Sequence, residues 1–262
     1  MRKMVIALLM LGLVTASSAF AGSLLNEGFT YPNGNLVGND GWVNYSGSGD
    51  IQVVSYLANG QMGVTASGGD DHTPYTLRTT SDVTYACFDV MIPCGTLNPS
   101  PLASYFAGLN ATATPTTMVA RVYVLPITGG WTFGLSNSST ASTTVYGATP
   151  WGSTPLACDT WYHIVIKYDP TVGTSTMWVN PVNQASASIT NTNNSNPAVA
   201  VNTFFLRQGA ASTFPAPGYP GTGLWKWSVD NVGVGTTFDN ACYSAPVPVK
   251  AATWGHLKAL YR

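Results

Sequence analysis

The stretch "DTWYHIVIKYDPTVGTSTMWVNP", residues 159–181, constrains the fold more than any other part of the chain. Two segments in which apolar and polar residues alternate, as in half-buried β-strands, flank the turn sequence "DPTVG". Pro170 fixes a φ suited to a turn and Gly173 permits a positive one. The stretch therefore predicts a β-hairpin whose inner side carries Tyr162, Ile164, Ile166 and Tyr168, with His163, Val165, Lys167 and Asp169 on its outer side.

Similar short segments rich in Val, Ile, Tyr, Phe, Trp and Thr recur along the chain, with Gly, Pro, Asn and Asp between them. About a dozen such segments without helical periodicity predict an all-β fold of two packed antiparallel sheets. We expect strands near 24–29, 51–57, 61–66, 74–79, 84–92, 103–110, 118–127, 131–136, 143–147, 161–168, 174–179, 202–208 and 225–237, and loops at 147–155, 189–198 and 211–223.

The clearest alternation is "TYACFDVMI", which places Phe88, Val90 and Ile92 on one face of a strand. Cys87 and Asp89 then lie on the opposite face. Packing of two sheets would bury the first set.

The two ends of the chain differ from this pattern. Residues 1–21 have a basic start, an apolar run and the cleavage sequence Ala19-Phe20-Ala21, which predict a secretory signal peptide. The sandwich domain is expected at 22–243. A proline-spaced linker (244–252) and a short helical tail (253–262) follow, and the tail resembles a sorting or surface-attachment segment.

Charge is sparse. Removing Arg2 and Lys3 with the leader leaves 8 basic against 11 acidic residues, a net charge of −3, and charged residues make up only 8% of the chain. Such a surface provides no basic patch for nucleic acid and suits uncharged partners such as glycans. We therefore predict a secreted or cell-surface protein.

Four cysteines in an exported chain predict two disulfides. If residues 87–92 form a strand, they advance about 17 Å, and the two following residues could return only about 7 Å of that. This geometry disfavours a Cys87–Cys94 bond. Among the remaining pairings we predict Cys87–Cys242 with Cys94–Cys158, which would join strand ends to strand starts.

Three motifs carry a resemblance to a known family: the hairpin "WYHIVIKYD…WVN", the strand "WSVDNVGVG" (227–235) and, more weakly, "YACFDVMI". Together they resemble laminin G-like domains of the concanavalin A-like lectin/glucanase superfamily. The resemblance covers roughly residues 24–240 and implies a jelly-roll sandwich. It leaves the function open, because the fold hosts lectins, adhesion modules and hydrolases. The hairpin histidine, here His163, usually has a structural role in this family.

Glu27 is the only glutamate, so the chain lacks the closely spaced acidic pair that glycosidases of this superfamily use. A jelly-roll polysaccharide lyase would instead need Arg, His and Tyr, for which Arg207, His163 and Tyr168 are candidates, with Gln208 as a further donor. No catalytic residue is assigned.

Two kinds of binding residue stand out. Asp70 and Asp71 in "GGDDHT" are candidate ligands of a structural calcium ion, because calcium prefers carboxylate oxygens. Aromatic rings and a few polar groups typically line sugar sites. The candidate glycan-binding residues are Trp131, Trp151, Trp178, Tyr105 and Arg207.

These observations predict a non-catalytic secreted or cell-surface sandwich that binds glycan or another surface, or acts in adhesion. A polysaccharide lyase of jelly-roll type is one alternative. A self-assembling extracellular structural protein is another, since low charge gives little protection against pairing of edge strands and homo-assembly.

Overall fold

The computed structural model describes residues 22–47, 49–55, 57–62, 70–93, 104–111, 117–127, 130–137, 145–146, 155–193, 198–208 and 225–242. The expected signal peptide, linker and helical tail lie outside these ranges, as do Cys94 and Trp151. Within the described ranges, no helix has the length and apolar character needed to span a membrane.

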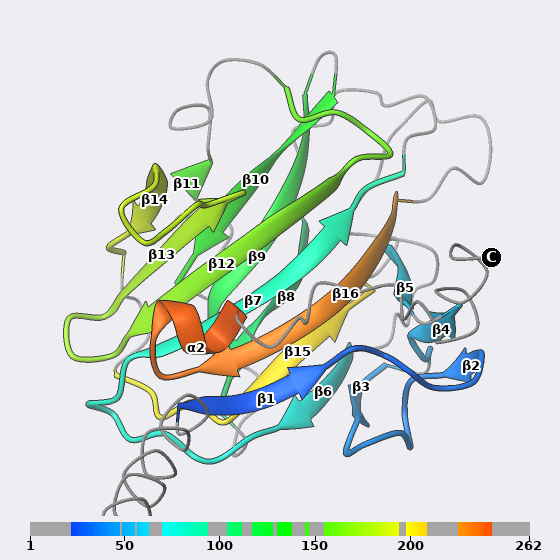
Figure 1. Ribbon diagram of the computed structural model, residues 1–262, viewed down its shortest axis with the longest axis horizontal. Helices are drawn as coiled ribbons and strands as arrows, with labels where there is room; N and C mark the ends of the chain where they lie inside the picture. The colour runs from blue at the N-terminus through cyan, green and yellow to red at the C-terminus, as the bar shows by residue number, and fades with distance from the viewer. Residues whose placement is uncertain are drawn as a thin grey trace, which may run out of the picture.

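The described residues form two antiparallel sheets, one of nine strands and one of seven, which are stacked face to face (Figure 1). The nine-stranded sheet contains, in spatial order, β14 (Ser188–Asn191), β13 (Thr174–Val179), β12 (Trp161–Asp169), β7 (Thr84–Met91), β16 (Trp225–Gly235), β5 (Leu57–Met62), β4 (Gln52–Val54) and β2 (Gly34–Asn35), with β1 (Ser23–Glu27) also paired to β16. The seven-stranded sheet contains β11 (Val145–Tyr146), β10 (Gly130–Ser136), β9 (Met118–Ile127), β8 (Ser104–Asn110), β15 (Thr203–Arg207), β6 (Asp70–Pro74) and β3 (Val43–Ser46).

The core lies between the two sheets and depends on alternation within each strand. Phe88 of β7 packs against Phe106 of β8 and Phe204 of β15, with ring centroids 5.9 and 5.7 Å apart. Val90 and Ile92 are fully buried in the same cluster, as the sequence predicts. The inward faces of both sheets thus interdigitate as in other sandwiches.

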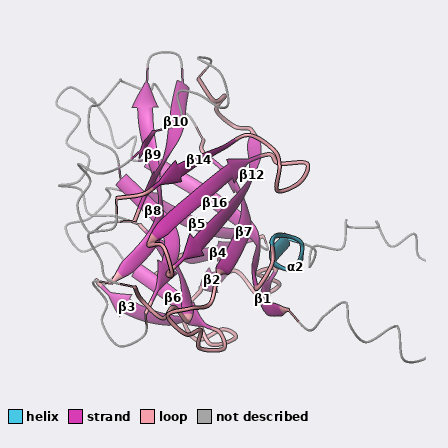
Figure 2. Ribbon diagram, turned by 90° about the vertical axis from the view of Figure 1, so that its left-hand side faces the viewer, coloured by secondary structure: helices cyan, strands magenta, loops and turns pink. Residues whose placement is uncertain are grey.

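A short helix, α2 (Phe238–Cys242), covers part of the outer face of the nine-stranded sheet (Figures 1 and 2). The Phe238 ring lies 5.4 Å from that of Trp178 and 6.3 Å from that of Tyr85. A Cβ at Gly235 would lie 2.6 Å from the Ala241 amide nitrogen, so this close approach requires a glycine. Residues 236 and 237 alone separate β16 from the helix.

The expected fold class, an all-β sandwich of two antiparallel sheets, is confirmed, and the central hairpin is β12 and β13 with the predicted inner face. The strand expected at 74–79 is wrong, because strand β6 occupies 70–74 instead. Its sequence, "DDHTP", is typical of a polar loop. Its two carboxylates are nevertheless satisfied, by Ser46 of β3, Arg207 of β15 and the Ile51 amide just before β4. Strands β2, β3 and β14 and helix α2 were not expected.

The single glutamate is a structural anchor. The buried carboxylate of Glu27 accepts hydrogen bonds from the Phe29 amide, from the Tyr31 hydroxyl at 2.6 Å and from the Trp42 indole at 2.8 Å. Glu27 therefore links the segment that follows β1 with the buried side chain of Trp42. Charge-assisted hydrogen bonds of this kind are among the stronger polar interactions in proteins.

We expect Glu27→Gln to lower the free energy of unfolding by about 1–3 kcal/mol, because a neutral amide cannot satisfy three buried donors. Urea denaturation of the purified protein measures this. Asp159→Asn is the control: Asp159 is exposed on a turn with φ 53°, a conformation that asparagine tolerates, and should change stability by less than about 0.5 kcal/mol. Equal effects of the two changes would contradict the anchoring role.

Candidate functional site

The outer face of the seven-stranded sheet carries a cluster of arginines and tyrosines. Phe204 and Leu206 of β15 lie in the core, so Phe205 and Arg207 point to the other side of the sheet. Cross-strand pairing of Tyr105 with Tyr123 places both rings on this outer face. We call the four residues Tyr105, Arg121, Tyr123 and Arg207 the arginine–tyrosine face.

Both guanidinium groups lie over tyrosine rings. Arg207 Cζ is 4.2 Å from the centroid of Tyr105, and Arg121 Cζ is 4.9 Å from the same centroid and 5.7 Å from that of Tyr123. Cation–π contacts of this geometry fix the planes of the guanidinium groups. The Tyr105 ring therefore contacts both guanidinium groups.

One carboxylate partly compensates the charge of this face. Arg207 Nε lies 3.1 Å from Asp70 Oδ1, and the Ser46 hydroxyl donates to the other oxygen of Asp70 at 2.6 Å. Burial raises the pKa of Asp70, and Arg207 and Ser46 oppose that increase. With two arginines and one aspartate, the cluster keeps a net positive charge.

Arg121 has hydrogen-bond donors that no described residue accepts. Its side chain is only 3% exposed, and its Nε and Nη2 have no hydrogen-bond partner among the described residues. A buried guanidinium with free donors favours an anionic acceptor nearby, since desolvation of unpaired donors costs free energy.

The structure brings two of the five candidate glycan-binding residues together, Tyr105 and Arg207. Trp131 is fully buried against Phe133 and Tyr162, so its ring cannot stack on a sugar. Trp178 is 4% exposed beneath α2. Both tryptophans were predicted as sugar contacts only because they are aromatic. Their burial rules out this role. The period-two pattern of β9 was the signal for Arg121, which the sequence analysis missed.

Asp70 and Asp71 were expected as calcium ligands in a loop. They instead lie in strand β6, where consecutive side chains point to opposite faces. Asp71 accepts from the Ile51 amide at 3.0 Å and from the Asn44 side chain at 3.3 Å, whereas Asp70 pairs with Arg207. The expected shared loop site is therefore wrong in its geometry.

A second cluster lies on the outer face of the nine-stranded sheet. His163 Nδ1 is 2.6 Å from Asp89 Oδ1, and one ligand atom from each of Cys87, His163 and Cys242 lies within 4.8 Å of the others. Burial lowers the pKa of His163, but hydrogen bonds with Asp89 and Cys242 outweigh it and raise that pKa to about 9. The hydrogen bond with Cys87 and that with His163 lower the pKa of the Cys242 thiol, and the pKa of Cys87 is raised.

The cysteines differ from the expected pairing. Cys87 and Cys242 are adjacent free thiols in this structure, so their predicted bond stays a prediction. Cys158 is disulfide-bonded, and its predicted partner Cys94 lies outside the described residues.

The residues considered for a lyase do not converge. His163 lies outside the nine-stranded sheet, Arg207 outside the seven-stranded sheet, and Tyr168 is fully buried with its hydroxyl accepting from the Val199 amide at 3.1 Å. Their separation on two sheets excludes a common active site.

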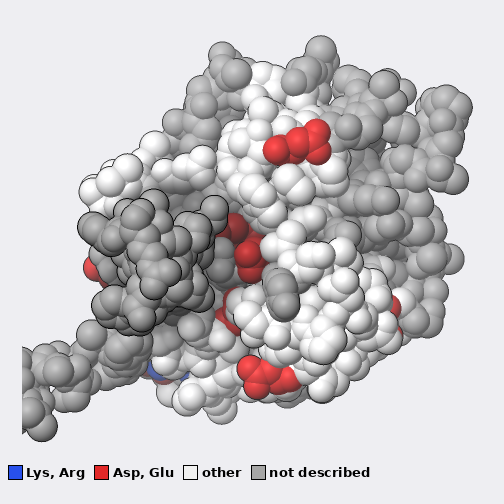
Figure 3. Space-filling view, turned by 45° about the vertical axis from the view of Figure 1, so that its right-hand side comes forward, with Lys and Arg blue, Asp and Glu red and all other residues white. Residues whose placement is uncertain are grey.

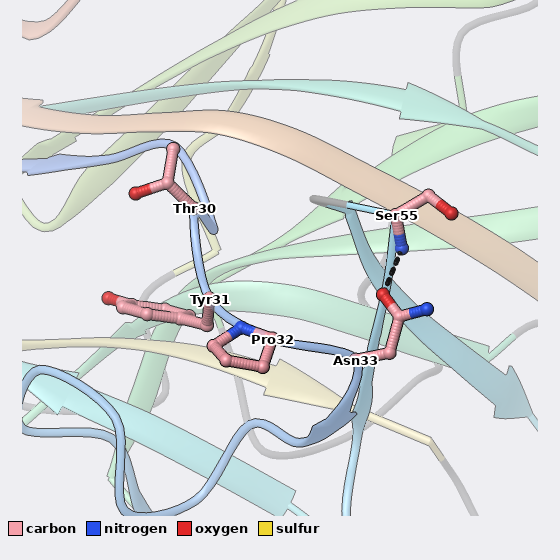
Figure 4. A pocket seen from close by; sticks show the side chains of 5 residues that line it. All are labelled: Thr30, Tyr31, Pro32, Asn33 and Ser55. Carbon is pink, nitrogen blue, oxygen red and sulfur yellow. Dashed lines mark hydrogen bonds between the residues drawn. The ribbon is translucent and has the colours of Figure 1, made fainter.

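A pocket of about 560 Å³ lies beside the Glu27 anchor, lined by Thr30, Tyr31, Pro32, Asn33 and Ser55 (Figure 4). The Ser55 amide donates to Asn33 Oδ1 at 2.7 Å, and the Tyr31 hydroxyl is bonded to Glu27. These polar groups have protein partners already. In the space-filling view of Figure 3, acidic side chains of the described residues form small separate patches, and a small basic patch is visible at the lower left.

The sequence matches no family model and no curated protein. Among solved structures, the endo-β-1,4-glucuronan lyase of the fungus Trichoderma reesei is similar, with 13% identity, 82% of this chain and 96% of that chain covered, and a TM-score of 0.49. An immunostimulatory antigen and pseudo β-1,3-glucanase of Mycobacterium tuberculosis has 12% identity, coverage of 83% and 100%, and a TM-score of 0.48. Winged bean acidic lectin, in complex with methyl-α-D-galactose, has 11% identity, coverage of 82% and 98%, and a TM-score of 0.48.

The two antiparallel sheets of the chain show a β-sandwich, which is the fold class that the sequence predicts. At these identities and TM-scores, none of the three proteins transfers an activity or a ligand to this chain.

The buried carboxyl of Asp71 gives a pH test of its environment. Burial raises the pKa of Asp71 to about 7, so the folded state favours the protonated carboxyl. This stabilisation is complete below about pH 4 and is lost as the pH rises through 7. Relative to Asp71→Asn, we expect the wild type to lose on the order of 2–4 kcal/mol between pH 4 and pH 8.

Urea denaturation across this pH range measures the difference, with Asp159→Asn as the exposed control. Parallel pH curves for the wild type and Asp71→Asn would contradict the raised pKa.

Proposed function

We propose that this protein is a non-catalytic, exported cell-surface sandwich that binds an acidic glycan through the arginine–tyrosine face. The observation that carries the proposal is the stacking of Arg207 over Tyr105, with the buried Arg121 close to the same ring and two of its nitrogens without a hydrogen-bond partner in the described part of the chain. Adhesion to a polysaccharide coat or matrix is the role that such binding supports.

The residue types favour a sugar that carries a carboxylate or sulfate group. Guanidinium groups form bidentate hydrogen bonds with such anions, and an aromatic ring packs against the apolar face of a pyranose. Ligand sites commonly combine an aromatic surface with a few polar groups that fix orientation. Tyr105 and Arg207 are both half-buried, so part of each reaches solvent.

The chemistry needed for hydrolysis is not supported in the described part of the chain. Glu27, the only glutamate, is buried and occupied by three structural donors. Asp70, the only carboxylate described at the arginine–tyrosine face, pairs with Arg207 and Ser46. Both carboxylates are therefore already engaged in structural contacts.

Binding of the purified protein to a soluble polyuronate and to a neutral glucan of similar length tests the proposal. We expect the polyuronate to bind more tightly and Arg207→Ala to weaken its binding at least tenfold, about 1.4 kcal/mol or more. Tyr105→Leu should weaken binding while keeping the Arg207–Asp70 pair, which guards against a folding defect in the arginine variant.

Lys167→Ala is the matched control, because Lys167 is a cation on the other sheet, paired with Asp169 at 3.2 Å. It should leave the affinity unchanged. Equal loss in Lys167→Ala and Arg207→Ala would show non-specific charge attraction and refute the site. Release of unsaturated uronate products, measured by ultraviolet absorbance, would refute the non-catalytic assignment.

A further inference from the structure

The cluster under α2 has the composition of a metal site. Cys87 lies on the outer face of β7, and His163 on β12 is the cross-strand partner of Asp89, two residues further along β7. Helix α2 folds back over this face and brings Cys242 to the same place, 155 residues away from Cys87 in the chain. Two sulfurs and an imidazole nitrogen within 4.8 Å of one another therefore come from three different elements.

The histidine is oriented as metal-binding histidines usually are. Asp89 accepts from His163 Nδ1 at 2.6 Å and, through its other oxygen, from the Asn231 side chain at 2.8 Å. An acceptor carboxylate at Nδ1 fixes one proton there, so Nε2 is the nitrogen that can bind a metal ion once it has released its own proton. Asn231 reaches Asp89 from an irregularity in β16, where its φ is 53° and the register with β7 shifts. Bulges of this kind commonly redirect a side chain toward a site.

The surroundings limit access of water at Cys87, whereas the His163 side chain is 35% exposed. Cys87 is 3% exposed and belongs to a small apolar cluster with Tyr85, Val165, Trp178 and Phe238. An apolar shell strengthens coordination by thiolates, because it excludes competing solvent. The hydrogen bond that the Cys87 thiol now donates to the Ala241 carbonyl, at 3.0 Å, is lost when the thiol is deprotonated.

We propose that Cys87, Cys242 and His163 bind a divalent transition-metal ion of the zinc class. Coordination requires both sulfurs as thiolates and the His163 imidazole as neutral, so binding releases the protons that these three groups carry. The three ligands leave a fourth tetrahedral position for water or another donor. Zinc lies about 2.3 Å from sulfur and 2.0–2.1 Å from nitrogen, which sets ligand atoms about 3.4–3.8 Å apart. Sulfur and imidazole ligands together favour zinc, cobalt and related ions over calcium or magnesium.

The site is independent of the proposed glycan binding, because it lies on the other sheet. It competes instead with the predicted Cys87–Cys242 disulfide, which uses the same two sulfurs. A metal requires both cysteines as thiolates, and the structure contains them as free thiols.

Titration of the reduced full-length chain with cobalt(II), under argon and after removal of the reductant, tests the proposal. We expect one cobalt ion per chain, a thiolate-to-cobalt charge-transfer absorption in the near ultraviolet, and its loss on addition of zinc. Cys242→Ser and His163→Gln should each weaken cobalt binding at least tenfold. Asp89→Asn should weaken it about 10- to 100-fold, as expected for a residue that orients a ligand.

His72→Gln is the matched control, because His72 is a half-buried histidine on β6 of the other sheet. It should leave the charge-transfer absorption unchanged. Thermal denaturation of each variant shows whether it folds. If Asp89→Asn does not fold, Cys242→Ser still tests the proposal, because it changes a partly exposed residue.

Three outcomes would overturn the proposal: no charge-transfer absorption, an absorption that persists in Cys242→Ser, or a Cys87–Cys242 disulfide that resists reduction in the folded protein. Peptide mapping without reductant detects the last of these.

Discussion

Contact between the two sheets through Phe88 is the constraint on which the remaining structure depends. Its ring lies against Phe106 and Phe204 of the opposite sheet, and the core extends from these contacts. Because side chains alternate along a strand, burying Phe88 turns Cys87 and Asp89 outward. Burying Phe204 likewise turns Arg207 outward. The packing of one aromatic cluster thus selects the residues that each outer face can present.

The two outer faces carry different chemistry as a result. The seven-stranded sheet presents arginines over tyrosine rings with one paired aspartate, which suits an anionic ligand. The nine-stranded sheet presents thiols, an imidazole and a carboxylate beneath a helix, which suits a soft cation. The core between the sheets separates the two clusters, so substitutions in one are expected to act independently of the other.

Irregular positions, more than regular ones, shape the second cluster. Asn231 adopts a positive φ at the shift in register of β16, and Gly235 allows α2 to approach the sheet closely. The positive φ of Asn231 brings its side chain to Asp89, and the absence of a side chain at Gly235 makes room for the helix that carries Cys242. Local backbone strain of this kind is commonly retained where surrounding contacts require it.

The sequence by itself determined the class of the fold, because alternation of apolar residues predicts strands and the inward face of each. It thereby predicted the hairpin at 161–179 and the burial of Phe88, Val90 and Ile92. It did not determine which distant strands lie side by side. Local periodicity carries no information about pairing partners, which depend on how the sheets pack.

Only the tertiary structure therefore decided that Asp70 faces Arg207 and that His163 lies apart from both. The same packing buried Trp131, which residue type had suggested as a sugar contact. It also gathered Cys87, His163 and Cys242 into one cluster, because α2 folds back over β7 and β12 and brings together residues that are remote in sequence.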